Sequence, residues 1–563
     1  VALICLECPS QIRTLPSLLM PVTSSTLYDG IILGGGHNGL ILQAYLGKAG
    51  LKVLCLDRRH IAGGGLTTEE DPAQPGFFHN THSFFHRGIT QMPWYHDLNL
   101  EDYGLRYVEP ALNVALLLKN DGALEWWTDF DRTYESFASF SRGDAETLRK
   151  WRDRFIPIVE DILVPESRSP PIPPDERQTL LQQSTDGRLL LAVAQLSPLE
   201  FVRQEFEHPL IQAGLLFFNG LREVDPFCKG FGHHIPALLA SPGKAQMCIG
   251  GSAALARALL NAVADSGGEV RLQVRLRRII VERNTAVGIE TEDGETISAR
   301  SFVASTLNPH QTFLELLDED SIPSHWREKA QAFKYNLLAP LFGLYLDLKN
   351  APAYSAAEKR PQLKQALMMI LGLDHVDQFA EILHHHVAGT IPPTIMWGSC
   401  PTLFDKTQAP QEKHTAFMWE KVPYAVHGDA QNWNLLKREH GKKMLSKWNH
   451  FAPNVESDVI SWFVRTPLET ESAFPNMRQA DLLVGSFTNG QVGYNRPFKG
   501  AGHYRGPLKG LYLGGSSCHP GGNITGLPGY NCAQTILADL GISAAWVPPP
   551  LHERLTKLKT IAV

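Results

Sequence analysis

Gly34-Gly35-Gly36-His37-Asn38-Gly39 stands between two apolar runs, residues 28–33 and residues 40–46. The first run has the length and character of a buried strand, and the second continues as a helix. A further apolar run, residues 53–56, reads as another strand and ends on Asp57. This order of strand, glycine turn, helix, strand and acid is typical of a dinucleotide-binding site.

Each part of the pattern has a physical role. Gly34 permits the tight turn, and Gly36 has no side chain to keep a pyrophosphate away from the backbone. Gly39 lets the helix pack closely on the strand, and the helix N-terminus offers free N–H groups to phosphates. Asp57 can accept hydrogen bonds from ribose hydroxyls. The alternative is a glycine-rich turn that binds nothing.

A second glycine segment, Gly63-Gly64-Gly65, follows Asp57 closely. NAD does not need glycines at this position. A larger cofactor, whose phosphates and ribityl chain run over a second glycine-lined segment, explains them better.

Here the sequence resembles a known family. The run D-x-R-x-x-x-G-G at Asp57, Arg59, Gly63 and Gly64 resembles the FAD site of the amine oxidase and phytoene desaturase superfamily. Residues 250–259, 267–270 and 276–279 resemble the family's central segment, in which Leu276 would hold the adenine through its backbone. Residues 510–526 resemble the motif that closes over the flavin.

The last motif also indicates the branch of the superfamily. Amine oxidases usually carry an acid at the position of Ser516 and an arginine at that of Gly65. The His-Pro-Gly-Gly run at residues 519–522 is instead of the phytoene desaturase style.

The resemblance implies FAD as the cofactor and a set of residues that bind it. These are Gly34, Gly36, His37, Asn38, Gly39, Asp57, Arg58, Arg59, Gly63, Gly64, Gly65, Leu66, Leu276, Gly515, Ser516, Gly522, Asn523 and Ile524. The helix that begins near Gly526 is expected to aim its N-terminus at the pyrimidine edge of the flavin ring.

The expected fold class is α/β, with a Rossmann-like FAD-binding domain and an α+β substrate domain that carries a mixed sheet and capping helices. The FAD domain is discontinuous and takes residues 26–90, 246–310 and 490–545. The substrate domain takes residues 91–245 and 311–489. Residues 1–25 form an N-terminal extension, and residues 546–563 a C-terminal tail.

Patterns within the substrate domain are less regular. Residues 90–245 read mainly as helices and loops, with a buried helix from Pro209 and a long proline-rich surface loop over residues 165–174. Residues 337–348 and 392–420 read as strands.

Composition limits the functional classes. A length of 563 residues, with 43% hydrophobic and 20% charged residues, indicates a globular protein of about two domains. The net charge of −6 argues against nucleic-acid binding. No apolar run reaches the roughly 18 residues of a transmembrane helix, which leaves peripheral membrane contact open. The oligomeric state is not indicated.

The eight cysteines form no disulfide framework, which suggests a reducing compartment. The cytoplasm is therefore the expected location, with the mitochondrion as the alternative.

Candidates for catalysis are His519, as a proton carrier, and Arg496, as a pocket residue. Shaping the helix entry and packing the loop are the favoured alternatives for them. His79, His82 and His86 divide between structural and substrate-contact roles. No metal site is expected, because the adjacent side chains of His384, His385 and His386 cannot converge on one ion.

The favoured function is an FAD-dependent oxidoreductase that transfers a hydride between a carbon of a moderately hydrophobic small molecule and flavin N5. Two alternatives are an amine oxidase-type flavoenzyme and a non-catalytic protein with a flavin fold that binds a partner. The substrate, the re-oxidant and the mode of flavin attachment are not indicated by the sequence.

Overall fold

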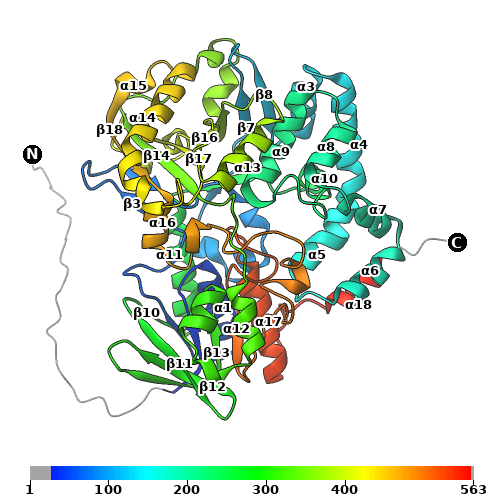
Figure 1. Ribbon diagram of the computed structural model, residues 1–563, viewed down its shortest axis with the longest axis vertical. Helices are drawn as coiled ribbons and strands as arrows, with labels where there is room; N and C mark the ends of the chain where they lie inside the picture. The colour runs from blue at the N-terminus through cyan, green and yellow to red at the C-terminus, as the bar shows by residue number, and fades with distance from the viewer. Residues whose placement is uncertain (1–26, 559–563) are drawn as a thin grey trace, which may run out of the picture.

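Two sheets, one in the lower and one in the upper half of Figure 1, organise the computed structural model of the chain. The structure describes residues 27–558, apart from the side chains of residues 218–223. The expected N-terminal extension at residues 1–25 lies outside the described residues.

The first elements confirm the prediction from the glycine-rich turn. They are β1 (Tyr28–Leu33), α1 (His37–Lys48) and β2 (Val53–Leu56). β1 and β2 are parallel neighbours. Both strands are apolar along nearly their whole length because helices cover the sheet.

The rest of the first sheet comes from distant parts of the chain. β10 (Glu269–Arg271) extends it beyond β2, and β13 (Thr296–Ser305) pairs with β1. β19 (Leu511–Leu513) pairs with the C-terminal half of β13, also in parallel. β11 (Leu276–Glu282) and β12 (Thr285–Thr291) continue from the other half of β13 as an antiparallel meander.

Helix α1 packs against α11 (Ser252–Asp265) and α17 (Leu527–Leu540), and α17 lies beside it in Figure 1. Residues 37–46 of α1 are all buried. Three separated segments thus meet around one helix, and the first sheet and its helices share one core.

The upper sheet has the order β18-β14-β17-β16-β15-β7-β8 and is antiparallel except where β7 meets β15. Helix α14 (Trp433–Phe451) covers one face, and a group of helices covers the other. The strands are β7 (Leu112–Leu117), β8 (Ala123–Trp127), β14 (Leu341–Leu348), β15 (Met368–Leu371), β16 (Met396–Ser399), β17 (His414–Lys421) and β18 (Val459–Arg465).

Residues 90–245 are mainly helices and loops, as predicted, but two details differ. Strands β7 and β8 interrupt the expected helices, because their apolar residues pair with β15, far along the chain. The expected proline-rich loop is short: Pro165 is buried in α5 (Val164–Ser167), and α6 (Pro174–Gln182) begins at Pro174. Proline at the start of a helix leaves no backbone donor unsatisfied.

The predicted buried helix is α9 (Pro209–Glu223). The other helices are α2 (Pro93–Asp97), α3 (Phe130–Ala138), α4 (Arg142–Ile158), α7 (Thr185–Ala194), α8 (Pro198–Glu205), α10 (His234–Ala240), α12 (Ser324–Gln331), α13 (Gln378–Ala388), α15 (Val455–Asp458), α16 (Pro467–Ala473) and α18 (Leu551–Leu555). The short strands are β3 (Thr68–Glu70), β4 (Phe78–Asn80), β5 (His86–Arg87), β6 (Tyr107–Val108) and β9 (Ala245–Cys248).

Candidate functional site

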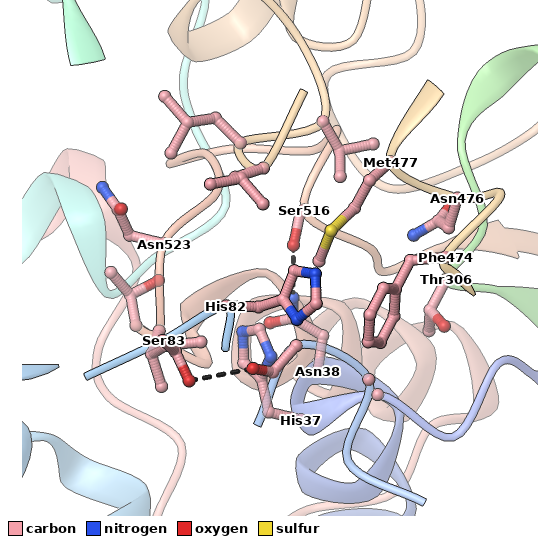
Figure 2. Close-up of a pocket in the computed structure, with 18 of the residues that line it drawn as sticks. His37, Asn38, His82, Ser83, Thr306, Phe474, Asn476, Met477, Ser516 and Asn523 are labelled. Carbon is pink, nitrogen blue, oxygen red and sulfur yellow. Dashed lines mark hydrogen bonds between the residues drawn. The ribbon is translucent and has the colours of Figure 1, made fainter. Parts of the chain in front are cut away.

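A cavity of about 620 Å³ is lined by residues of both sheets and of the segments that connect them. Its size is typical of a small-molecule or cofactor site. In Figure 2, Asn523 and Phe474 lie on opposite sides of His37, Asn38 and His82. The lining includes Gly34 and Gly36 of the glycine-rich turn and also Trp397 and Trp419 of the upper sheet, so the cavity extends from the turn to that sheet.

The two glycine segments lie against each other. The backbone N–H of Gly63 donates to the carbonyl of Gly35 at 2.7 Å, and Gly36 and Gly63 form a parallel bridge. Gly34 has a φ of +100°, which a residue with a side chain rarely adopts. A side chain at Gly39 would begin 2.1 Å from the carbonyl oxygen of Gly34, so that glycine serves helix packing.

Gly36 differs from Gly39 because it faces open space. A Cβ atom there would meet only the Cα of Gly64, at 3.9 Å. The N-terminus of α1 begins at the same place, and Asn38 Nδ2 donates to Ser516 Oγ at 3.0 Å. The buried atoms His37 Nε2 and Asn38 Oδ1 have no partner among the described residues. Backbone space and a helix N-terminus together fit a diphosphate group.

Asp57 is half-buried at the mouth of the loop. Its Oδ2 accepts from Gly35 N and its Oδ1 from Arg59 N, both at 2.8 Å. The carboxylate thus positions both glycine segments, while it still lines the cavity together with Arg58 and Leu276. The Arg59 guanidinium lies 4.2 Å from the centre of the Phe474 ring and donates to Gly64 O at 3.0 Å.

Three buried imidazoles line the middle of the cavity, and burial lowers the pKa of each. The pKa of His37 falls to about 4 and that of His86 to about 3, while that of His82 lies well below the ordinary value. All three pKa values are lowered because burial removes water from the charged imidazolium form and so disfavours it. The three rings are therefore neutral at neutral pH.

In two of these three rings, the Nδ1 atom is in contact with a protein hydroxyl group. His86 Nδ1 contacts the Tyr107 hydroxyl at 2.8 Å, and His82 Nδ1 contacts the Thr81 hydroxyl at 2.9 Å. The Nε2 atoms of both rings have no partner among the described residues. A neutral ring with one nitrogen anchored and the other unpaired can accept or donate a hydrogen bond in the cavity.

Helix α17 begins at the cavity wall. Ile524, Thr525 and Leu527 line the cavity, and Trp94 Nε1 donates to the carbonyl of Thr525 at 2.7 Å. Gly526 caps the helix with a φ of +66°. The positive end of a 14-residue helix dipole therefore lies near the cavity, as expected for a group that carries negative charge.

The structure brings most of the predicted cofactor residues together. The cavity is lined by Gly34, Gly36, His37, Asn38, Asp57, Arg58, Arg59, Gly64, Gly65, Leu276, Ser516, Asn523 and Ile524. Five others are not part of that lining: Gly39, Gly63, Leu66, Gly515 and Gly522. Gly515 and Gly522 each have a backbone carbonyl within 2.2 Å of where a Cβ would be, so they permit close packing of the wall.

The two catalytic candidates lie outside the cavity lining. His519 Nε2 contacts the backbone carbonyl of Glu166 at 2.8 Å. The fully buried Arg496 donates to several backbone carbonyls, among them those of Ser486 and Ser516. These contacts favour the packing roles that the sequence analysis preferred for both residues.

Several lining residues were not predicted. Thr306 directly follows β13. Ligands bind beyond the carboxyl ends of parallel strands, so this position in the chain could have predicted that Thr306 lines the cavity. Phe474, Asn476 and Met477 come from a loop after α16 without any recognisable motif. Of the three histidines considered, His82 and His86 reach the cavity, whereas His79 bonds to Asp347 at 2.8 Å within the protein.

Among residues 27–558, no three His, Cys, Asp or Glu side chains are placed to hold a metal ion. His384, His385 and His386 lie near the end of α13, and His386 is buried against the helix. None of the helices in the described part of the chain has both the length and the apolar character needed to cross a bilayer.

Comparison with known proteins agrees with this geometry. The NAD(P)-binding Rossmann-like domain family matches residues 32–98. A limonene dehydrogenase polypeptide of Castellaniella defragrans is 30% identical, over 92% of this chain and 96% of that protein. Pyridine nucleotide-disulfide oxidoreductase domain-containing protein 2 of Mus musculus is 25% identical, over 91% and 94%.

A phytoene desaturase (lycopene-forming) of Paracoccus sp. is 22% identical, over 92% of this chain and 99% of that protein. Among solved structures, cyclohexylamine oxidase from Brevibacterium oxydans superposes with a TM-score of 0.57, at 14% identity over 91% and 99% of the two chains. That likeness shows a shared fold.

Proposed function

Because this chain belongs to the amine oxidase and phytoene desaturase superfamily of flavin-dependent oxidoreductases, we propose that its flavin is FAD, bound along the glycine-lined cavity. The substrate we propose is a moderately hydrophobic small molecule that is dehydrogenated, desaturated or oxidised at carbon. The observation that carries the proposal is the meeting of two glycine segments and two helix N-termini on one cavity.

We assign the parts of FAD to parts of the cavity. The diphosphate belongs beside Gly36, Asn38 and Ser516, where open space and the N-terminus of α1 meet. The adenosine belongs beside Asp57 and Leu276. The cavity continues past β1, α1 and β2 to Asn523 and the N-terminus of α17. This extra length favours FAD over a shorter dinucleotide, which the Rossmann-like match at residues 32–98 would not distinguish.

When bound, the flavin supplies a hydride acceptor. The chain's own residues supply the surroundings of that reaction. The N-terminus of α17 stabilises negative charge near the wall, and the neutral His82 and His86 can form hydrogen bonds with a ligand through Nε2. Phe84, Phe85 and neighbouring apolar groups exclude water from the far end of the cavity.

The test is direct. Purified protein is expected to be yellow and to release FAD, identified by chromatography, on denaturation. Anaerobic flavin bleaching is then measured against alcohols, amines and polyenes. A colourless protein that does not bind added FAD would overturn the proposal, and bleaching by amines alone would favour the amine oxidase alternative.

We place the protein in the cytoplasm, with the mitochondrion as the alternative, to be checked by fluorescent tagging.

A further inference from the structure

Two buried histidine rings line the cavity, each with one nitrogen that lacks a protein partner. His82 and His86 are 8% and 1% exposed, and both belong to the lining. The Nδ1 atom of each ring contacts a hydroxyl group, whereas neither Nε2 atom has a partner among the described residues. What the two Nε2 atoms can bind depends on which nitrogen of each ring carries the proton.

The Thr81 hydroxyl decides the tautomer of His82. Thr81 is 5% exposed, and its hydroxyl contacts His82 Nδ1 at 2.9 Å, with no other hydrogen-bond partner in the described part of the chain. If Nδ1 carried the ring proton, the buried hydroxyl proton would have no acceptor, which is the costlier arrangement. Thr81 therefore donates to Nδ1, and the proton of the neutral His82 ring is on Nε2.

The Tyr107 hydroxyl decides the tautomer of His86 in the same way. It has one proton, and its possible acceptors are His86 Nδ1, at 2.8 Å, and the sulfur of Cys248. An imidazole nitrogen is a good acceptor and a thiol sulfur a weak one, so Tyr107 donates to Nδ1. The proton of the neutral His86 ring is therefore also on Nε2, and both rings present an N–H donor.

The two rings face different parts of the cavity. A protonated His86 would be repelled by His37, at the start of α1, where we place the diphosphate. His82 instead packs edge-on against Phe474, with 4.2 Å between the ring centres (Figure 2). It also lines a small hollow that Leu341 of the upper sheet shares. His82 therefore lies between the proposed position of the cofactor and the upper sheet.

The His82 donor is neutral and held in place. Burial and the nearby guanidinium groups of Arg465 and Arg59 lower its pKa well below the ordinary value, so the ring carries no charge at neutral pH. The next residue along the chain, Ser83, donates from Oγ to the carbonyl of Gly65 at 2.9 Å. A fixed, neutral N–H group selects a ligand that has a hydrogen-bond acceptor, because a buried donor without a partner is costly.

We propose that Nε2–H of His82 donates a hydrogen bond to a carbonyl oxygen of the substrate, which is therefore an apolar ketone, aldehyde or enone. This inference rests on the proposed function, because it names the substrate class for the same cavity. A carbonyl oxygen has lone pairs and no proton, so it satisfies the donor fully. Phe84, Phe474 and Met477 also line the cavity and offer apolar surface to the carbon framework.

Other substrate classes fit the His82 donor less well. A hydrocarbon has no acceptor, and a protonated amine would bring a second donor against Nε2–H. An alcohol can accept from Nε2–H, but its own proton then needs an acceptor that His82 does not supply in this tautomer. His82 is therefore a specificity-determining residue that acts on binding, and the reacting C–H bond lies elsewhere in the substrate.

Nitrogen NMR of histidine-labelled, FAD-loaded protein tests the tautomer. The signals of His82 are assigned by their loss in His82→Gln, and we expect a protonated Nε2 and an unprotonated Nδ1. Thr81→Val keeps the size of its side chain and removes the hydroxyl donor, so it should raise the fraction of His82 with a protonated Nδ1. A protonated Nδ1 in the wild type would overturn the inference.

The ligand test compares compounds that share one carbon skeleton. Limonene, carveol and carvone have no oxygen, a hydroxyl group and a carbonyl group, respectively, and β-ionol and β-ionone form a second pair. Each is titrated into the FAD-loaded protein, and binding is followed by calorimetry and by the change in the flavin spectrum. We expect at least one ketone to bind about fivefold or more tightly than its matched alcohol. Ketones that bind no better than the alcohols, or not at all, would overturn the inference.

Variants assign the preference to one nitrogen atom. His82→Phe keeps a ring and removes the donor, so ketone and alcohol should bind with similar affinity, whereas His82→Gln returns an N–H donor and should restore part of the preference. His86→Phe is the matched control, because it removes the other unpaired Nε2 and should leave the preference in place. An undiminished preference in His82→Phe, or one lost only in His86→Phe, would contradict the assignment.

Failure of this inference is distinguishable from failure of the proposed function. FAD content is measured first on every preparation. A yellow protein without a preference for ketones contradicts only the role of His82, whereas a protein that does not take up FAD contradicts the cofactor assignment itself. If His82→Phe weakened FAD binding and left the preference unchanged, the partner of His82 would be the cofactor, and the inference would be wrong. The comparison of ligands on the wild type holds even if a variant does not fold.

Discussion

At the residue scale, the open space beside Gly36 allows binding to be separated from folding. Gly36→Val is expected to fold, because its backbone has ordinary extended dihedral angles and a Cβ would meet nothing closer than 3.9 Å. Its side chain would occupy the proposed position of the diphosphate, so purified Gly36→Val should be colourless. Absorption at the flavin band and circular dichroism measure the two properties.

Gly39→Val is the matched control. Its Cβ would begin 2.1 Å from the Gly34 carbonyl oxygen, so we expect a loss of stability of about 1–3 kcal/mol from overpacking. Full flavin occupancy in Gly36→Val would contradict the assignment of the diphosphate.

The buried imidazole of His37 predicts a pH dependence of stability. Its pKa is about 4 in the folded protein and near 6.5 in the unfolded chain, because burial disfavours the charged ring. The unfolded state therefore binds more protons between these values, and stability falls as pH is lowered from about 6.5 to 4. The contribution of this ring is on the order of 3 kcal/mol at most.

Urea denaturation of flavin-free protein at several pH values measures this effect. His37→Gln removes the titrating group and should show a shallower loss of stability below pH ~6.5. An unchanged slope would show that His37 is hydrated or paired in the folded protein.

At the scale of elements, the segment before α17 is held against the cavity wall by close backbone packing. A Cβ at Gly522 would lie 2.2 Å from the carbonyl oxygen of Leu483, which lines the cavity. Gly522→Leu should therefore displace the wall, shift the flavin spectrum and slow flavin reduction by about tenfold or more. Retention of the wild-type spectrum and rate would place this segment away from the flavin.

His519 connects the same segment to α5 through the carbonyl of Glu166. His519→Ala should lower stability by about 1 kcal/mol, because it leaves that partly buried carbonyl without its partner. The pH profile of flavin reduction should keep its shape. A large rate loss with a shifted profile would instead support proton transfer by His519.

At the scale of the whole molecule, residues of both sheets line the cavity, so a ligand that fills it should stabilise both sheets. Its lining includes Gly34 and Thr306, which directly follow β1 and β13, at one end and residues of β14, β16 and β17 at the other. FAD at a hundredfold excess over its dissociation constant should stabilise the protein by about 2.7 kcal/mol. Thermal unfolding with and without FAD measures this effect.

Hydrogen exchange locates the protection. We expect FAD to slow exchange in β14 and β17 as well as in β1 and β13, whereas AMP should protect only the strands near Asp57 and Leu276. Protection by FAD confined to the first sheet would show that the flavin end does not reach the upper one.

β1, α1 and β2, the glycine turn and the acid that follows could be predicted from the sequence, because all of these depend on residues that are neighbours along the chain. Apolar periodicity and glycine position decide such local structure. The resemblance of residues 250–279 and 510–526 to a known family pointed to two further segments, and Leu276, Ser516 and Asn523 from them line the same cavity.

The remaining features depend on contacts between residues that lie far apart in the chain. Strand β7 pairs with β15 across about 250 residues, and no local pattern specifies a partner at that distance. Phe474 and Met477 reach the cavity from a loop without a motif, and the buried Lys421 lines it from the end of β17. Its burial follows from the register of β17 beside β14 and β16, which is set by packing between distant strands.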